Sequence, residues 1–95
     1  MRIAIAGGTG MVGRRITEAA RERGHDTAVL SRREGVDVLT GQGLDAALEG
    51  ADVVIDALNI GTQNARRATE FFTATSRNLL EAEERAGTRH HIVLS

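Results

Sequence analysis

Short apolar runs alternate with amphipathic stretches along the whole of this chain. The runs are continuously apolar and short, which is typical of strands covered on both faces of a parallel sheet. We expect strands at residues 3–6, 27–30, 36–39, 53–57 and 92–94. Helices are expected from residue 12 to Gly24, around Leu44 and Leu48, and over residues 64–86. This alternation, with short connections, predicts an α/β fold.

Right-handed crossovers between these strands predict a Rossmann-type, doubly wound parallel sheet with strand order 3-2-1-4-5. A ligand crevice is then expected at the carboxyl ends of the first and fourth strands. The long helix supports this arrangement, because its apolar positions recur at steps of four and three and define one buried stripe. The stripe consists of Ala68, Phe72, Thr75, Leu79, Ala82 and Ala86. Gly87 is expected to end this helix, and residues 81–85 to form a solvated face.

The connection between the first strand and the first helix is rich in glycine. Gly7, Gly10 and Gly13 have the spacing G-x-x-G-x-x-G within residues 6–13. A helix N-terminus has unpaired backbone N–H groups and partial positive charge, so a strand, a glycine turn and a helix together can bind a diphosphate. Gly7 permits the tight turn, Gly10 the approach of phosphate, and Gly13 close packing of helix on strand. The alternative is a purely structural turn.

Composition adds limits to this interpretation. The chain has 95 residues and a net charge of −1, so no strongly basic surface indicates nucleic acid or anionic lipid as a partner. All 12 cationic residues are Arg, and Lys, Tyr, Trp, Pro and Cys are missing from the sequence. Without Cys there is no disulfide or thiolate metal site, and with no long apolar run no membrane span is expected. We expect a cytoplasmic protein.

The residues after the second strand bear on the choice of cofactor. NADP-binding proteins place Arg near the 2′-phosphate, whereas NAD-binding proteins place an acidic residue on the ribose. Ser31, Arg32 and Arg33 occupy this position and favour NADP. Glu34 is close enough to bind the ribose of NAD instead, while Asp26 lies at the wrong end of the strand. The arginines are otherwise a solvated loop.

Other candidate residues each have a structural alternative. Arg14 lies in the first turn of a helix, where a phosphate would offset its repulsion by the dipole, but a solvent-facing side chain is the simpler expectation. Asp37 is expected at the adenine edge or in a loop. Asn59 either binds the second ribose or shapes a turn. His90 and His91 have no third ligand at a suitable spacing, so no metal site is expected.

The sequence ends within an apolar segment, at Ser95. A terminal strand usually needs cover. We therefore expect residues 1–95 to be one dinucleotide-binding domain, the front part of a longer protein. The alternative is a complete small protein that pairs this edge with a second copy.

These features together resemble the atypical short-chain dehydrogenase/reductases, and within them the NmrA-like NAD(P)H-binding branch. The matching segments are residues 6–13, 30–32, 53–59, 71–72, 78–80 and 91–95. The resemblance implies that the diphosphate is lined by Gly7, Thr9, Gly10, Met11 and Val12. It also implies that Arg32 meets the 2′-phosphate and that Asp37 and Val38 flank the adenine.

The resemblance further implies that Ser95 stands where many relatives carry an active-site Ser or Thr, beside a Tyr-x-x-x-Lys pair. This chain has neither Tyr nor Lys, and a Ser at the end of a strand is usually structural. We therefore expect dinucleotide binding without turnover, since general acid catalysis needs a titratable group close to the substrate.

Three functions remain open at this point. The first is the NADP(H)-binding part of an oxidoreductase acting on a small carbonyl, alcohol or quinone. The second is a non-catalytic module that senses the dinucleotide and regulates a partner. The third is an inactive fragment, which would melt with weak cooperativity or aggregate through its last strand.

Overall fold

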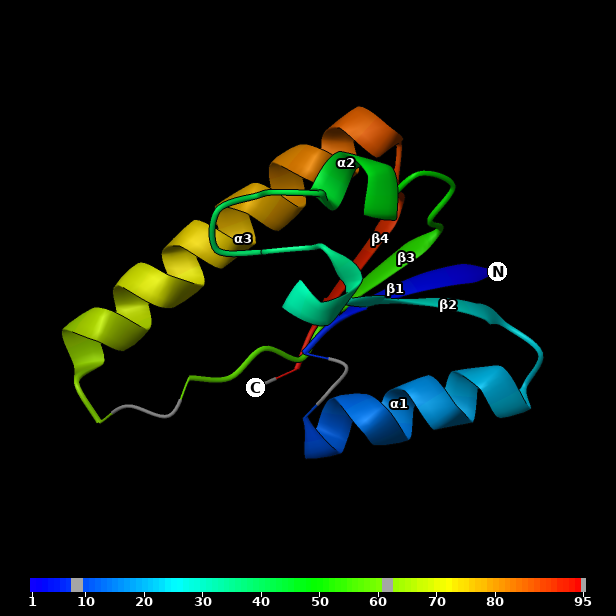
Figure 1. The fold of residues 1–95 in the computed structure, drawn as a ribbon, viewed down its shortest axis with the longest axis horizontal. Helices are drawn as coiled ribbons and strands as arrows, with labels where there is room; N and C mark the ends of the chain where they lie inside the picture. Colours follow the sequence, from blue (N-terminus) through cyan, green and yellow to red (C-terminus); the bar gives the residue numbers. More distant parts are fainter. Residues whose placement is uncertain (8–9, 61–62, 95) are drawn as a thin grey trace.

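The protein forms a four-stranded, fully parallel sheet with helices on both faces (Figure 1). The structure is a computed structural model, and it describes residues 1–7, 10–60 and 63–94. The sheet has the order β2-β1-β3-β4. Its strands are β1 (Arg2–Ala6), β2 (Asp26–Leu30), β3 (Val53–Asp56) and β4 (His90–Val93). The α/β class and the Rossmann-type arrangement are therefore confirmed.

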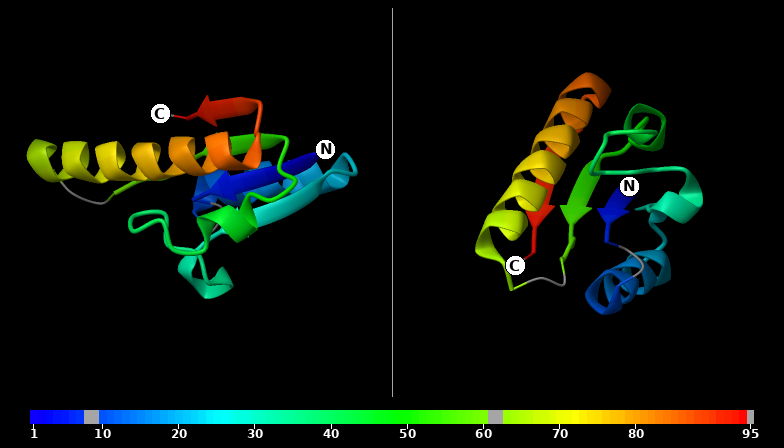
Figure 2. Two further views of the ribbon diagram at one scale, coloured as in Figure 1. Left: turned by 90° about the horizontal axis from the view of Figure 1, so that it is seen from above. Right: turned by 60° about the vertical axis from the view of Figure 1, so that its left-hand side comes forward.

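The two faces of the sheet are covered by different helices, as Figure 2 shows. Alternate residues of β1 point to opposite faces. Ile3 and Ile5 pack toward α1 (Met11–Glu22), with Ala20 in the same cluster. Ala4 and Ala6 belong to the second cluster, which contains the buried side chains of α2 (Leu44–Ala47) and α3 (Ala65–Ala86). One apolar cluster therefore lies on each face of β1, which explains the continuously hydrophobic sequence of this strand.

Register places the carboxyl ends of the strands side by side. Ala6 is paired with Leu30 on one side and with Asp56 on the other, and Asp56 is paired with Val93. The glycine turn, the segment after β2 and the segment after β3 therefore leave the sheet at one edge. This is the edge at which open parallel sheets bind ligands.

The expected strand at residues 36–39 is wrong, and with it the outer position in the predicted order. Val36 and Val38 are buried as in a strand, but Asp37 forms only an isolated antiparallel bridge with Gln42. Gly41 and Gly43 adopt φ values of 88° and 78°, which turn the chain back on itself. The apolar alternation therefore reflects the burial of Val36 and Val38 in the cluster that also contains Leu79 of α3. The backbone of the segment pairs only within its own loop, between Asp37 and Gln42. A short 3-10 helix, η1 (Arg32–Glu34), precedes this loop.

The long helix is confirmed at both ends, with Asn64 as N-cap and Gly87 left-handed at φ 75°. Its buried stripe is confirmed only over Thr75, Leu79 and Ala82. Phe72 is 37% exposed, since the first turns of α3 extend past the sheet in Figure 1.

The expected solvated face at residues 81–85 is wrong at Glu83, while Ala82 in the same run is buried as part of the expected stripe. Glu83 is only 5% exposed, and its Oε2 lies 2.6 Å from Nδ1 of His91 on β4. Burial raises the pKa of the Glu83 carboxyl, and the negative charge of Asp56 adds to this, while the hydrogen bond and charge of His91 oppose it.

Candidate functional site

The glycines of the first turn have two different roles. Gly7 has φ 82°, and a Cβ there would lie 2.4 Å from the carbonyl oxygen of Ala57. The fold itself therefore requires glycine at this position. Gly10 is the N-cap of α1 with φ −77°, and among the described residues its Cβ would meet only the carbonyl oxygen of Gly7, at 3.5 Å. Because the described fold would accept a side chain at Gly10, packing does not explain why this residue is glycine.

The N-terminus of α1 is open toward this space. No side chain caps it, and its first turn contains no acidic residue. Met11 is 75% exposed and Val12 is 57% exposed, although both are apolar. Gly13 is buried. The expected diphosphate residue Thr9 lies outside the described residues.

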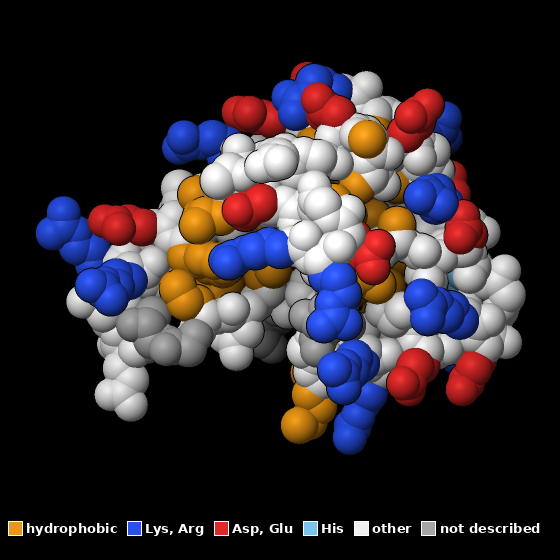
Figure 3. Space-filling view, viewed as in Figure 1, with side chains coloured by type: hydrophobic (Ala, Val, Ile, Leu, Met, Phe, Trp, Pro, Cys, Tyr) orange, Lys and Arg blue, Asp and Glu red, His pale blue; other side chains and the backbone are white. Residues whose placement is uncertain are grey.

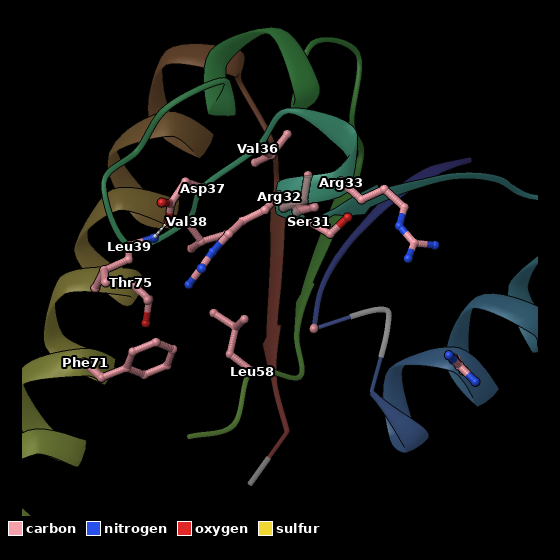
Figure 4. A pocket seen from close by; sticks show the side chains of 13 residues that line it. Ser31, Arg32, Arg33, Val36, Asp37, Val38, Leu39, Leu58, Phe71 and Thr75 are labelled. Atoms are coloured by element: carbon pink, nitrogen blue, oxygen red, sulfur yellow. Dashed lines mark hydrogen bonds between the residues drawn. The ribbon is translucent and has the colours of Figure 1, made fainter. Parts of the chain in front are cut away.

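A cavity of about 450 Å³ lies between η1, the loop after it and α3 (Figure 4). It brings together six residues that the sequence predicts as a site: Gly7, Ser31, Arg32, Arg33, Asp37 and Val38. Arg14, which the sequence analysis considered as a phosphate contact, also lines it. The remaining lining residues were not predicted as a site: Leu30, Val36, Leu39, Leu58, Phe71 and Thr75. Only the sheet topology places the last three near the arginines, since they come from the segment after β3 and from α3. The adjacent Phe71-Phe72 pair was the only sequence signal of an aromatic wall.

Three arginines line this cavity: Arg14, Arg32 and Arg33. Figure 4 shows Arg32 extending across the cavity toward Thr75 and Phe71, whereas Arg33 points toward α1. Within the described ranges, Arg14, Arg32 and Arg33 form no ion pair. Figure 3 shows basic side chains beside an area of hydrophobic ones on this face. Such an arrangement suits a ligand with an apolar ring and an anionic group.

The loop that forms the cavity wall is fixed to α3 by one side chain. Nδ2 of Asn78 donates to the carbonyl oxygens of Val38 at 3.0 Å and Leu39 at 2.9 Å. Oδ1 of Asp37 accepts the Leu39 N–H at 3.0 Å. The Asp37 carboxylate is thus engaged in its own turn while it lines the cavity. Asn78 acts on the cavity through the loop.

A second cavity, of about 560 Å³, lies between the end of β3, α3 and the end of β4. Its lining residues are Val12, Asp56, Ala57, Leu58, Asn59, Phe72, Ser76, Val93 and Leu94. Asn59, which the sequence predicts as a ribose ligand, is exposed and its Oδ1 accepts the Ile60 N–H at 2.9 Å. The other open interpretation, that Asn59 shapes a turn, agrees with this bond. Ser95 lies outside the described residues.

The two cavities flank the glycine turn. Gly7 lines the first and Val12 the second, and Leu58 lines both. One cavity is rich in arginine, and the other is mainly apolar with a buried carboxylate. A ligand with two rings and an anionic bridge between them fits this arrangement.

Across the described ranges, no three His, Cys, Asp or Glu side chains come together as metal ligands would. Among the helices described, none has the length and apolar character that a membrane crossing needs.

Comparison with known proteins gives consistent matches along the chain. A family model described as the NAD dependent epimerase/dehydratase family matches residues 3–95. The mouse (Mus musculus) epimerase family protein SDR39U1 is 36% identical over 74 residues, which cover 76% of this chain and 25% of that protein. The chain therefore spans about a quarter of the length of this curated relative.

Solved structures share the fold. The UDP-N-acetylglucosamine 4-epimerase of Bacillus cereus has a TM-score of 0.80 at 25% identity, over 98% of this chain and 38% of that one. The UDP-glucose 4-epimerase of Thermus thermophilus, solved in complex with NAD, has a TM-score of 0.79 at 24% identity, over 96% of this chain and 36% of that one.

Proposed function

The chain belongs to the NAD-dependent epimerase/dehydratase family, and we propose that it is a binding domain for a nicotinamide dinucleotide, with NADP(H) preferred to NAD(H). The observation that carries this proposal is the pair of cavities on either side of the glycine turn. The adenosine end enters the arginine-lined cavity, the diphosphate binds at the N-terminus of α1, and the second nucleoside enters the other cavity.

The preference for NADP(H) rests on Arg32 and Arg33, with Ser31 as a hydroxyl donor. A guanidinium group matches a phosphate in charge and in the direction of its N–H groups. Both arginines line the adenosine cavity and have no carboxylate partner in the described part of the chain. Glu34, the rival ligand for the ribose of NAD, is exposed and does not line the cavity.

The site residues in this proposal are those predicted from the sequence. Gly10, Met11, Val12 and Thr9 face the diphosphate, with Gly7 and Gly13 shaping the turn. Asp37 and Val38 contact the adenine, and Asn59 lies at the second nucleoside. Ser95 is kept as a candidate catalytic residue.

The wider role is also a proposal. We place the protein in the NmrA-like branch and in the cytoplasm, with a small carbonyl, alcohol or quinone as substrate of an enzyme that contains this domain. Residues 1–95 have no Tyr or Lys to serve as a general acid, and a dinucleotide-sensing module is kept as the second candidate. Ile92 and Val93 on β4 are exposed, and we keep pairing of β4 with a second copy as a proposal.

Calorimetric titration of the chain with NADPH and NADH tests the proposal directly. We expect both to bind, and NADPH to bind more tightly because only it carries the 2′-phosphate. Equal affinity, or tighter binding of NADH, would contradict the NADP preference. Failure of both to bind would contradict the function.

A further inference from the structure

The second cavity contains one charged residue that no predicted role explains. Asp56 ends β3, is 3% exposed and lines this cavity. Its Oδ1 accepts the Leu58 N–H at 3.1 Å. In the described part of the chain this is the one hydrogen bond to the Asp56 carboxylate. A carboxylate has about four acceptor positions, so most of the acceptor capacity of Asp56 is unused.

The unused acceptor positions of Asp56 are open to the cavity, since Nε of Arg2 is the one fully buried side-chain atom without a hydrogen-bond partner among the described residues. Side chains of Val12, Leu58, Phe72 and Val93 contribute apolar walls to the cavity. Buried polar groups normally have hydrogen-bond partners, because leaving them unpaired costs free energy. The neighbouring acid Glu83 is itself negative when ionised, and His91 is bonded to Glu83. Among the described residues no cation is paired with Asp56, and donors on a ligand in the cavity would use its remaining acceptor positions.

The position of Asp56 determines which part of the ligand its carboxylate can contact. Ala57, the next residue, is in backbone contact distance of Gly7, since a Cβ on Gly7 would lie 2.4 Å from its carbonyl oxygen. In a dinucleotide the ribose follows the diphosphate, and the base comes after the ribose. A carboxylate one residue from the glycine turn is therefore placed for a sugar, whose two neighbouring hydroxyls are both donors.

We propose that Asp56 is a specificity-determining residue that accepts hydrogen bonds from the hydroxyls of the second ribose. This inference rests on the proposed function. It differs from the predicted role of Asn59, which lines the same cavity but is exposed and has its Oδ1 bonded to the Ile60 N–H.

Asp56→Asn is the decisive variant, because asparagine keeps the oxygen that accepts the Leu58 N–H and loses only the charge and the second acceptor. Asp52→Asn is the matched control. Asp52 precedes the same strand at its other end, and its Oδ2 likewise accepts one backbone N–H, that of Arg2 at 2.8 Å.

Three probes are titrated by calorimetry into the wild-type chain and both variants, with thermal melting as a check of folding. NADPH has both nucleosides, 2′-phospho-ADP-ribose keeps the second ribose without nicotinamide, and adenosine 2′,5′-bisphosphate has neither. We expect Asp56→Asn to weaken the first two about tenfold, as for one charged hydrogen bond. Binding of the third probe should not change, and Asp52→Asn should leave all three unchanged.

The other outcomes are distinct. Equal loss for all three probes would overturn the inference by making Asp56 structural. Loss confined to NADPH would overturn it by assigning the carboxylate to the nicotinamide. No change with any probe would also overturn it. If the wild-type chain binds none of the probes, the proposed function fails as well.

Discussion

The two ends of the sheet treat their polar groups differently, although the same strands run through both. At the amino end the protein pairs most of these groups with one another, although the buried Nε of Arg2 has no hydrogen-bond partner among the described residues. The guanidinium of Arg2 forms an ion pair with Asp26, the Arg2 N–H donates to Asp52, and the Thr88 hydroxyl donates to the carbonyl oxygen of Ala51. These bonds connect β1, β2, β3 and β4 at their starts.

At the carboxyl end comparable groups have no protein partner within the described residues. Arg14, Arg32 and Arg33 have no ion pair, and the α1 N-terminus has no side-chain cap. Two cavities open here, and apolar side chains such as Met11 remain exposed.

We attribute this difference to the proposed ligand binding, which is favoured over stability at the carboxyl end of the sheet. Unpaired arginines repel one another and exposed apolar groups lose the free energy of burial. A ligand with anionic and apolar parts offsets both costs. The contrast can be tested by substitutions at each end.

The largest expected effects separate two glycines of the same turn. Gly10→Val should leave the chain folded, because the backbone conformation suits any residue and the Cβ meets none of the described residues closer than 3.5 Å. It should abolish NADPH binding, since the side chain fills the space in front of α1. Calorimetry and thermal melting of the variant measure both effects.

Gly7→Val is the companion variant, and it should fail for a different reason. A left-handed conformation costs a non-glycine residue about 1–3 kcal/mol, and the backbone contact with Ala57 adds to this. We expect a clear loss of melting temperature. A Gly10→Val chain that binds NADPH normally would show that the diphosphate site is elsewhere.

The next effect concerns the arginines of η1. Arg32→Ala should weaken NADPH about tenfold or more, because a charged hydrogen bond to phosphate contributes roughly 1.5–3 kcal/mol. Binding of NADH should change little. The ratio of the two affinities, measured by calorimetry, is therefore the quantity to compare.

Arg23→Ala is the control for this experiment. Arg23 follows α1 at the amino end of the sheet, is exposed, and does not line either cavity. It should leave both affinities unchanged. A parallel decrease for NADPH and NADH in Arg32→Ala would assign Arg32 to the shared part of the ligand.

Much of the carboxyl end could be predicted from the sequence, because the signals there are local. The glycine turn and the Ser-Arg-Arg segment each occupy a few consecutive residues after a strand. The hydrophobic pattern that predicts the strand, and the position of each segment directly after it, were therefore enough to predict both. The residues that were missed come together only through tertiary packing. Thr75 and Phe71 reach the first cavity because α3 crosses above the sheet. Glu83 in a run of charged residues gave no sign of burial, since its partner His91 is on another element.

The failed strand at residues 36–39 has a related cause. Val36 and Val38 alternate with polar residues as in a half-buried strand. The competing signal was the pair of glycines at 41 and 43, together with the Asn78 side chain that takes two carbonyls of the segment. Apolar period predicts which side chains are buried, and it leaves the backbone partners undetermined.

Replacing Asn78 tests whether the first cavity depends on that contact. Asn78→Leu removes two hydrogen bonds and should lower the free energy of unfolding by about 1–2 kcal/mol. It should weaken NADPH and NADH to the same extent, because the loop shapes the adenosine cavity and the arginines are untouched. Gln42→Ala on the same loop, where the side chain is exposed, is the control. Selective loss of NADPH would contradict this assignment.

The smallest expected effect concerns the contact between Glu83 and His91, which is between the two ends of the sheet. Burial raises the pKa of Glu83 above its ordinary value of 4.5, so the folded chain binds a proton more readily than the unfolded chain. The free energy of unfolding should therefore fall as pH rises from 4.5 toward the raised value, and then level off. Glu83→Gln has no titrating group and should remove this part of the slope. Urea unfolding of both chains between about pH 4 and about pH 6 measures the difference, which amounts to at most about 1.4 kcal/mol for each unit of pKa shift. A difference that stays constant over this range would mean that His91 cancels the effect of burial on the pKa of Glu83. A difference that grows as pH rises would mean that His91 stabilises the carboxyl as an anion, and that this polar contact belongs with the self-paired groups of the amino end.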